Sequence, residues 1–297
     1  MTQPDLFVGI TSWNSELFLP HCLESLRRTT NASRTHLCVL DNSSVDGSIA
    51  IARKYGAEVL VRSCTQPDAL QELVRRSNGR YTLLLHADVI MLAADWLDRC
   101  TAKLSGNTIL VSPEDIGCGP LTRPFGAGMP ESSFLLFDTA GLRRSRTLTW
   151  RRRRRIPLPR RQFDFSGSHV THNIPKRLAE RGFDWHAMNV FVSNAEPEPL
   201  FVPGPDTTLW TEELGYLRYG LGNFYGIDGV ITHYHNWYDR VITTTPGQTP
   251  SSTPQRQRRE FPAAFINAYS QRFLADYQAG TVDLPRNLSS DRIPVAL

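Results

Sequence analysis

Short apolar runs alternate with longer amphipathic segments through roughly the first third of the chain. Each apolar run is about as long as a buried strand, and apolar side chains recur at helical spacing between the runs. The pattern predicts strands at 6–10, 36–40, 58–61 and 81–85. It predicts helices at 16–28, 49–55 and 69–77. This alternation is typical of a doubly wound, mainly parallel α/β sheet with helices on both faces.

Beyond residue 100 the alternation of apolar runs and amphipathic segments is less regular. It predicts helices at 93–103, 174–181 and 256–277, and strands at 108–112 and 132–137. A segment rich in Pro, Thr and Ser at 243–254 is too polar to pack and is interpreted as a linker. We therefore expect one domain over 1–242, with halves at 1–105 and 106–242, followed by a C-terminal helix and tail at 255–297.

Three predicted strands of the first half end in polar residues, at 11–14, 41–44 and 86–88. The carboxyl ends of strands in such a sheet converge on one crevice, where ligands bind. Asp88, with the small Ala87 before it, can hold a divalent cation against a diphosphate. Asp41 can accept a hydrogen bond from a base or a ribose hydroxyl. Each aspartate could instead cap the turn that follows, but three converging ends favour a binding site.

The order and spacing of these segments resemble a known family, the inverting nucleotide-sugar transferases of glycosyltransferase family 2, which have the Rossmann-like GT-A fold. The segments that carry the resemblance are VGITSWN (8–14), CLESL (22–26), VLDNSSVDGS (39–48) and NGRYTLLLHAD (78–88). The resemblance implies a donor-binding set of Thr11, Ser12, Asn14, Asp41, Asn42, Asp68, His86, Ala87 and Asp88. Asp68 stands where such proteins line the base pocket, and His86-Ala87-Asp88 occupies the D-x-D position.

His86 replaces the first aspartate of that motif. One carboxylate fewer should weaken cation binding, and an imidazole favours a softer ion such as manganese over magnesium. The resemblance implies Asp88 as a metal ligand, and a late histidine completes the site in many GT-A enzymes. His233 matches that position in kind, and strand periodicity places His235 on the same side. An aromatic packing strand with surface histidines is the alternative.

The general base is not evident from the sequence. In the resembled family an acidic pair opens a catalytic helix, and the second acid is the base. Val170 and Thr171 stand at those positions here, so the usual acid is missing. The substitutes are His172 and His169, then Asp164, then Asp206 at the start of a further helical segment. A histidine of near-neutral pKa can act as a base, although these residues could equally cap their helices.

Positive charge is concentrated in the middle of the chain, although the net charge is only +4. Ten arginines fall between Arg143 and Arg161. Such a cluster favours a polyanionic partner, unless it belongs to a solvated loop. We therefore expect an anionic acceptor, whether a glycan, a lipid-linked sugar, a protein or a nucleic acid. Three further arginines, Arg256, Arg258 and Arg259, lie at the start of the predicted C-terminal helix. This helix could dock on its own domain, pair with a second subunit or lie on an anionic bilayer; docking is favoured.

Nothing at the start of the chain resembles a secretory signal, and no run approaches 18 apolar residues. The five cysteines are odd in number and lack metal-type spacing, which indicates reduced thiols. We expect a cytoplasmic protein; the alternative is a cytoplasmic protein with peripheral contact at a membrane surface.

The family resemblance, taken with these observations, implies an inverting hexosyltransferase that uses a nucleoside-diphosphate sugar and a divalent cation, Mn²⁺ or Mg²⁺. A nucleotidyltransferase would need a glycine-rich, basic phosphate loop after the first strand, and the segment at 11–14 is not one. The remaining alternative is a non-catalytic nucleotide-sugar or glycan-binding protein on a decayed transferase scaffold. His86 and the missing acidic pair support that alternative.

Overall fold

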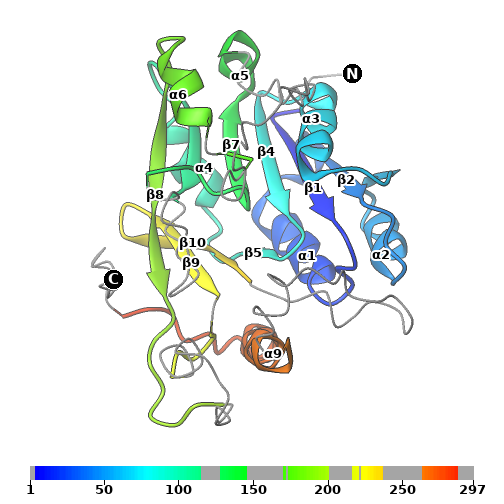
Figure 1. The fold of residues 1–297 in the computed structure, drawn as a ribbon, viewed down its shortest axis with the longest axis vertical. Helices are drawn as coiled ribbons and strands as arrows, with labels where there is room; N and C mark the ends of the chain where they lie inside the picture. The colour runs from blue at the N-terminus through cyan, green and yellow to red at the C-terminus, as the bar shows by residue number, and fades with distance from the viewer. Residues whose placement is uncertain are drawn as a thin grey trace, which may run out of the picture.

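The computed structural model describes residues 4–114, 128–145, 170–171, 173–200, 216–220, 222–236 and 263–286. Within these residues the strands form one ten-stranded sheet of order β3-β2-β1-β4-β7-β6-β8-β9-β10-β5. Figure 1 shows helices packed on the blue and cyan N-terminal half of this sheet and the strands of the C-terminal half beside it.

The N-terminal half contains every strand and helix that the hydrophobic pattern predicts there. Its elements are β1 (Leu6–Ser12), α1 (Leu19–Thr29), η1 (Ala32–Arg34), β2 (Thr35–Asp41), α2 (Ser48–Lys54), β3 (Glu58–Val61), α3 (Gln66–Arg76) and β4 (Tyr81–His86). The four strands pair in parallel. Helix α1 begins later than expected, because Pro20 occupies its first turn and residues 15–18 form a turn before it.

Successive side chains of β1 enter separate cores, which places helices on both faces of the sheet. Val8 and Ile10 pack with α1 and α2. Phe7, on the other face, packs with α3. Because strand side chains alternate between faces, both cores follow directly from a strand that is apolar throughout.

Beyond β4 the sheet becomes mixed. The elements are β5 (Val89–Met91), α4 (Trp96–Ala102), β6 (Thr108–Pro113), β7 (Phe134–Asp138), α5 (Thr139–Ser145), α6 (Ile174–Ala179), β8 (Asp184–Val192), β9 (Asn223–Ile227) and β10 (Val230–His235). Only β6 and β8 pair in parallel here; β7 runs antiparallel to both β4 and β6. The α/β class predicted from the sequence is confirmed, and the antiparallel pairs lie on the side where the sequence pattern is less regular.

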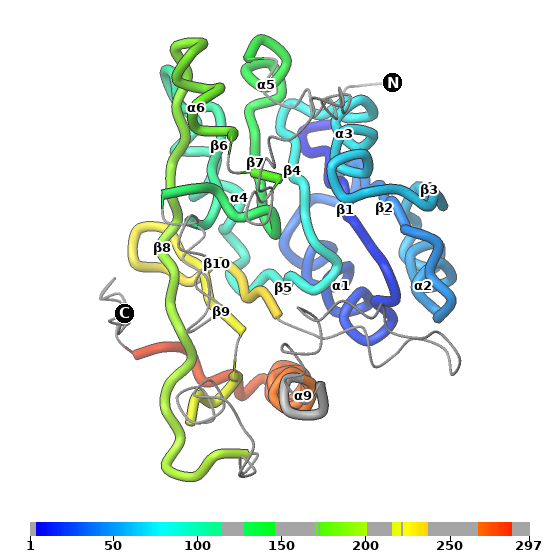
Figure 2. The backbone as a smooth tube through the Cα atoms, viewed as in Figure 1, coloured from blue at the N-terminus to red at the C-terminus, as the bar shows by residue number. Residues whose placement is uncertain are grey.

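Strand β5 is the short segment that joins the two halves at the candidate site. It follows β4 after one turn and pairs antiparallel with β10, whose other neighbour is β9. Figure 2 shows β5 alongside β10. The pairing sets His235 opposite Val89 and His233 opposite Met91. Residues more than 140 positions apart in the chain are thereby brought side by side.

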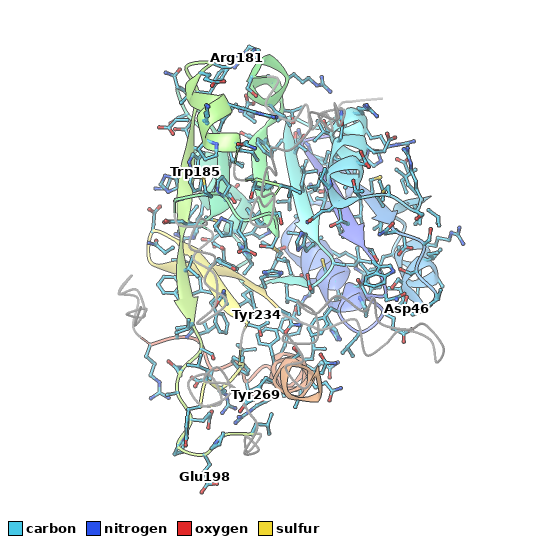
Figure 3. The ribbon with its side chains drawn as sticks, viewed as in Figure 1. Asp46, Arg181, Trp185, Glu198, Tyr234 and Tyr269 are labelled. Carbon is cyan, nitrogen blue, oxygen red and sulfur yellow. The ribbon has the colours of Figure 1, made fainter. Side chains whose placement is uncertain are left out.

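The C-terminal helix α9 (Ala263–Ala279) docks on its own domain. Phe273 is fully buried and stacks on Tyr234 of β10, with ring centroids 3.6 Å apart. Figure 3 shows Tyr234 and Tyr269 at the α9 end of the molecule. Arg218 and the Tyr219 hydroxyl both donate to Asp276 of the helix, at 2.9 and 2.8 Å. A C-terminal helical appendage is thus confirmed, while residues 256–262 and the expected linker at 243–254 lie outside the described residues.

No helix in the described ranges is long and apolar enough to cross a membrane.

We expect Phe273→Ala to destabilise the protein by about 3–5 kcal/mol, because it removes a fully buried ring and leaves a cavity against Tyr234. Urea unfolding followed by circular dichroism would measure this loss. The control is Gln271→Ala, an exposed position on the same helix, which should change the free energy of unfolding by less than about 0.5 kcal/mol. Equal effects from the two substitutions would contradict the docking of α9.

Candidate donor and metal site

The turns that follow β1 and β2 are tied together by hydrogen bonds. Asn14 has a φ of 45°, in the left-handed region that asparagine tolerates better than most residues. Its backbone N–H donates to the Ser44 hydroxyl at 2.8 Å, and its side-chain Oδ1 accepts from the Val45 N–H at 3.0 Å. The side chain of Asn42 in turn accepts from the Cys64 N–H at 2.8 Å. The polar strand ends therefore form one connected rim.

Asp41 is the centre of this rim. Its carboxylate is fully buried and accepts from the Ser44 N–H and hydroxyl, both at 2.7 Å, and from the Ser12 hydroxyl at 3.1 Å. These bonds connect the end of β2 to Ser44 in the turn that follows it and to Ser12 at the end of β1, so the carboxylate fixes the shape of the rim. The structure thus places Asp41 behind the pocket wall, and contact with a nucleoside stays a prediction.

A pocket of about 310 Å³ opens beside the rim. Its lining residues are Thr11, Ser12, Trp13, Leu40, Asn42, Cys64, Gln66, Ala69 and His86. Four members of the predicted donor-binding set line it: Thr11, Ser12, Asn42 and His86. The lining also includes Trp13, Cys64 and Gln66, which were not predicted from the sequence. Trp13 is 37% exposed. The signal available in the sequence was a large aromatic residue in the polar segment that follows a strand.

The other members of the predicted set do not line this pocket. Asp68 lies in the first turn of α3, where it accepts from the Thr65 hydroxyl at 2.6 Å and its N–H donates to that hydroxyl at 3.4 Å. This reciprocal bonding is a helix N-cap arrangement. Its neighbours Gln66 and Ala69 form the wall instead. Ala87 is buried in the turn before Asp88.

His86, Asp88 and His235 form a group of metal-ligating type at the edge of the pocket. One ligand atom from each lies within 4.8 Å of the others. His235 Nε2 is 3.6 Å from Asp88 Oδ1, and the two imidazole rings are 5.6 Å apart between centroids. The β5–β10 pairing builds this group, and the Asn236 N–H donates to the Asp88 carbonyl at 3.0 Å.

His233 lies outside this group, although the sequence analysis named it as the second ligand. It is fully buried, its ring stacks on Phe134 at 4.4 Å, and its Nδ1 is 3.0 Å from the Thr232 hydroxyl. Burial lowers its pKa to about 3, so the imidazole is neutral. Strand periodicity puts both histidines on one side, but the register with β5 leaves His235 at the strand end beside Asp88.

Glu131 is a residue that the sequence analysis did not single out. Its side chain is mostly buried, and its carboxylate lies 3.0 Å from His235 Nδ1 and accepts from the Tyr225 hydroxyl. Burial opposes its charge, but His235 and its hydrogen bonds outweigh burial and hold its pKa well below the usual range. Burial likewise opposes charge on His235, whereas Glu131 and Asp88 raise the pKa of that imidazole well above its ordinary value. His235 is therefore held between two carboxylates.

All four general-base candidates, His169, His172, Asp164 and Asp206, lie outside the described residues. Helix α6 begins at Ile174, just after the segment that contains His172. Thr171, at the position where an acid was expected, is fully buried, and its carbonyl accepts from the Ile174 N–H at 2.9 Å. The choice of base stays a prediction.

Comparison with known proteins gives the class. The model of glycosyl transferase family 2 matches residues 7–165, which is more than half of the chain. The chain therefore belongs to this family, and its α/β sheet is that of the GT-A glycosyltransferases. No curated protein sequence matches the chain.

Several solved transferase structures are similar to the chain at low identity. TarS 1–349 from S. aureus in complex with UDP-GlcNAc is 18% identical over 47% of this chain and 46% of that one, with a TM-score of 0.37. Mannosyltransferase PcManGT from Pyrobaculum calidifontis, in complex with GDP-Man and Mn²⁺, is 12% identical over 95% and 77%, with a TM-score of 0.46. Glucosyl-3-phosphoglycerate synthase from Mycobacterium tuberculosis with Mg²⁺ and UDP is 19% identical over 46% and 57%, at 0.38. The match to TarS spans about half the length of that chain.

We expect Asp41→Ala to raise the dissociation constant for the donor nucleotide more than it lowers turnover at saturating donor. The carboxylate holds Ser12, which lines the pocket, and Ser44 in the turn beside it, and it is not a member of the His86–Asp88–His235 group. Stability should also fall by about 1–3 kcal/mol, because buried donors lose their acceptor. Calorimetric titration with UDP and GDP would measure the affinity. Asp98→Ala, an exposed change on α4, is the control; an unchanged dissociation constant in the Asp41 variant would refute the role.

Proposed function

We propose that the protein transfers a hexosyl group from a nucleoside-diphosphate sugar to an acceptor hydroxyl with inversion. The observation that carries the proposal is the position of His86, which lines the pocket and also belongs to the group with Asp88 and His235. A pocket of nucleoside size thus shares a wall with a candidate cation site. A diphosphate joins a nucleoside to a sugar and prefers to lie against a cation, so one donor can occupy both.

The donor set of His86, Asp88 and His235 fits a first-row divalent ion. Ligands on opposite sides of such an ion, each about 2.1 Å from it, are about 4.2 Å apart. The ligand atoms lie within 4.8 Å of one another, so a movement of under about 1 Å brings them into range. Two imidazoles and one carboxylate suit Mn²⁺ better than Mg²⁺, which prefers oxygen ligands.

A bound cation would offset negative charge on the departing nucleoside diphosphate. The residues of the chain supply the remaining requirements. The lining of the pocket holds and orients the nucleoside, with the exposed ring of Trp13 available for stacking on the base. A base takes the proton of the acceptor hydroxyl, whose oxygen attacks the anomeric carbon opposite the leaving group. One displacement inverts the configuration and requires one base.

The acceptor is proposed to be anionic, whether a glycan, a lipid-linked sugar, a protein or a nucleic acid. The support is the arginine cluster, of which eight members lie outside the described residues. The two described members are exposed but also serve the fold. Arg143 donates to the Ser77 carbonyl at 2.7 Å, and the guanidinium of Arg144 lies 5.8 Å from the centre of the Phe183 ring. Recognition of an anion therefore falls mainly to residues 146–161.

We expect Asp88→Ala to abolish transfer and leave the fold intact, because Asp88 supplies the only carboxylate of the described cation group. UDP-, GDP-, dTDP- and CDP-sugars would be screened by thermal shift with and without Mn²⁺, since a ligand well above its dissociation constant stabilises the folded state. The stabilising donor would then be used in transfer and hydrolysis assays. Near wild-type turnover in the variant would overturn the proposal. Donor binding by the wild-type protein without any turnover would favour the non-catalytic alternative.

For the base, single substitutions of His172, His169, Asp164 and Asp206 by Ala should expose one dominant loss of turnover at saturating donor and acceptor. General-base catalysis contributes about 10²- to 10⁴-fold, so the loss should be of that order. Donor affinity should stay unchanged, because the base contacts the acceptor. If all four variants stay within about tenfold of wild type, none of these residues is the base.

A further inference from the structure

We propose that Glu131 is the positioning residue of the cation site. In this arrangement its carboxylate accepts the Nδ1 proton of His235, and the Nε2 atom beside Asp88 ligates the metal, releasing its own proton to solvent as the ion binds. The inference rests on the proposed function, because it assigns a role toward the cation of that site. It adds a residue that belongs to no sequence motif recognised above.

The geometry around His235 supports this assignment. Its two ring nitrogens have separate partners: Nδ1 is 3.0 Å from Glu131 Oε1, and Nε2 is 3.6 Å from Asp88 Oδ1. The Nδ1 contact has hydrogen-bond length, whereas the Nε2 contact is too long for a good one. An ion can lie between two groups that approach each other but do not form a good hydrogen bond. The Nε2 atom and the Asp88 carboxylate therefore face the cation position together.

Glu131 is itself held firmly from several strands. Its backbone N–H donates to the Pro113 carbonyl at 2.8 Å, and its carbonyl accepts from the Ser112 hydroxyl at 3.1 Å, both at the end of β6. Its second carboxylate oxygen accepts from the hydroxyl of Tyr225, which is buried in β9. With the backbone and both oxygens engaged, the carboxylate can fix the orientation of the His235 ring.

His86 is held quite differently. Its Nε2 is 3.0 Å from the exposed Gln66 amide nitrogen and 3.4 Å from the Ser132 hydroxyl. Neutral partners of this kind are easily replaced by a ligand in the pocket. His235 and Asp88 thus form the preformed half of the site, and His86 the adjustable half. A cation should consequently bind to the protein without nucleotide present.

A carboxylate behind a ligating histidine fixes the tautomer and raises the basicity of the ring, and loss of such a partner typically weakens metal binding 10- to 100-fold. We expect Glu131→Ala to raise the dissociation constant for Mn²⁺ by about that factor. Glu131→Gln should have a smaller effect, because its amide oxygen can still accept the Nδ1 proton. The measurement is a titration of the full chain with Mn²⁺ alone, counting free ion by electron paramagnetic resonance.

The chain offers a matched control. Glu58 on β3 lies 3.0 Å from His36 Nε2, the same separation as in the Glu131–His235 pair, but outside the site. Glu58→Gln should leave the Mn²⁺ dissociation constant unchanged. A merely structural role for Glu131 would lower stability without this selective loss of affinity. Wild-type affinity in folded Glu131→Ala would overturn the inference.

A second measurement uses the wild-type chain and does not depend on a folded variant. Nitrogen-15 spectra of the histidine rings, recorded with Zn²⁺ and assigned by comparison with His235→Ala, report which ring nitrogen carries the proton. The inference expects a proton on Nδ1 and the metal on Nε2. Metal ligation through Nδ1, or no ion binding by the wild-type chain, would overturn it.

Neither measurement contains a nucleotide or an acceptor, so this inference and the proposed function can fail independently of each other. If Mn²⁺ binds, Glu131→Ala weakens it and no sugar is transferred, the inference stands and the proposed function falls. If the wild-type chain transfers sugar while the Glu131 variants bind Mn²⁺ like wild type, only the inference falls.

Discussion

The antiparallel pairing of β5 with β10 is the interaction on which the candidate site depends. Strand β5 is three residues long and follows the turn that contains Asp88. Its register with β10 sets Val89 opposite His235, and the Asn236 N–H bonds the Asp88 carbonyl. Backbone hydrogen bonds thus bring together a carboxylate from the parallel half of the sheet and an imidazole from the mixed half. Without this ladder nothing would bring Asp88 and His235, which are far apart in the chain, close together in space.

The C-terminal helix supports the same strand from its other side. Side chains alternate along β10, so Tyr234 and His235 face opposite sides of the sheet. Tyr234 stacks on Phe273 of α9, while His235 faces Glu131 and Asp88. The burial of Phe273 and its neighbours therefore anchors the strand that carries His235. A helix far along the chain from the predicted nucleotide half contributes in this way to the geometry of the candidate site.

Charge balance explains why so polar a group can be buried. Isolated carboxylates in a protein interior are expensive, because they lose their hydration. Asp88 is buried, the side chain of Glu131 is mostly buried, and His235 lies between them with a raised pKa. The Tyr225 hydroxyl supplies a further donor to Glu131. Each charge therefore has a partner of opposite charge or a hydrogen bond.

The sequence by itself determined the alternation of strands and helices in the first half, the polar strand ends and the position of Asp88. These features depend on local periodicity and turn chemistry, which neighbouring residues encode.

The sequence also placed His233 and His235 on one side of a strand, but local periodicity does not tell which histidine reaches the site. Only the register with β5 selects His235. Glu131 stands alone in the sequence and becomes part of the site through contacts with β6, β9 and β10. Similarly, only the folded turns show that Asp41 bonds Ser12 and Ser44 behind the pocket wall. Tertiary structure decided these points because each depends on which distant segments the sheet brings together.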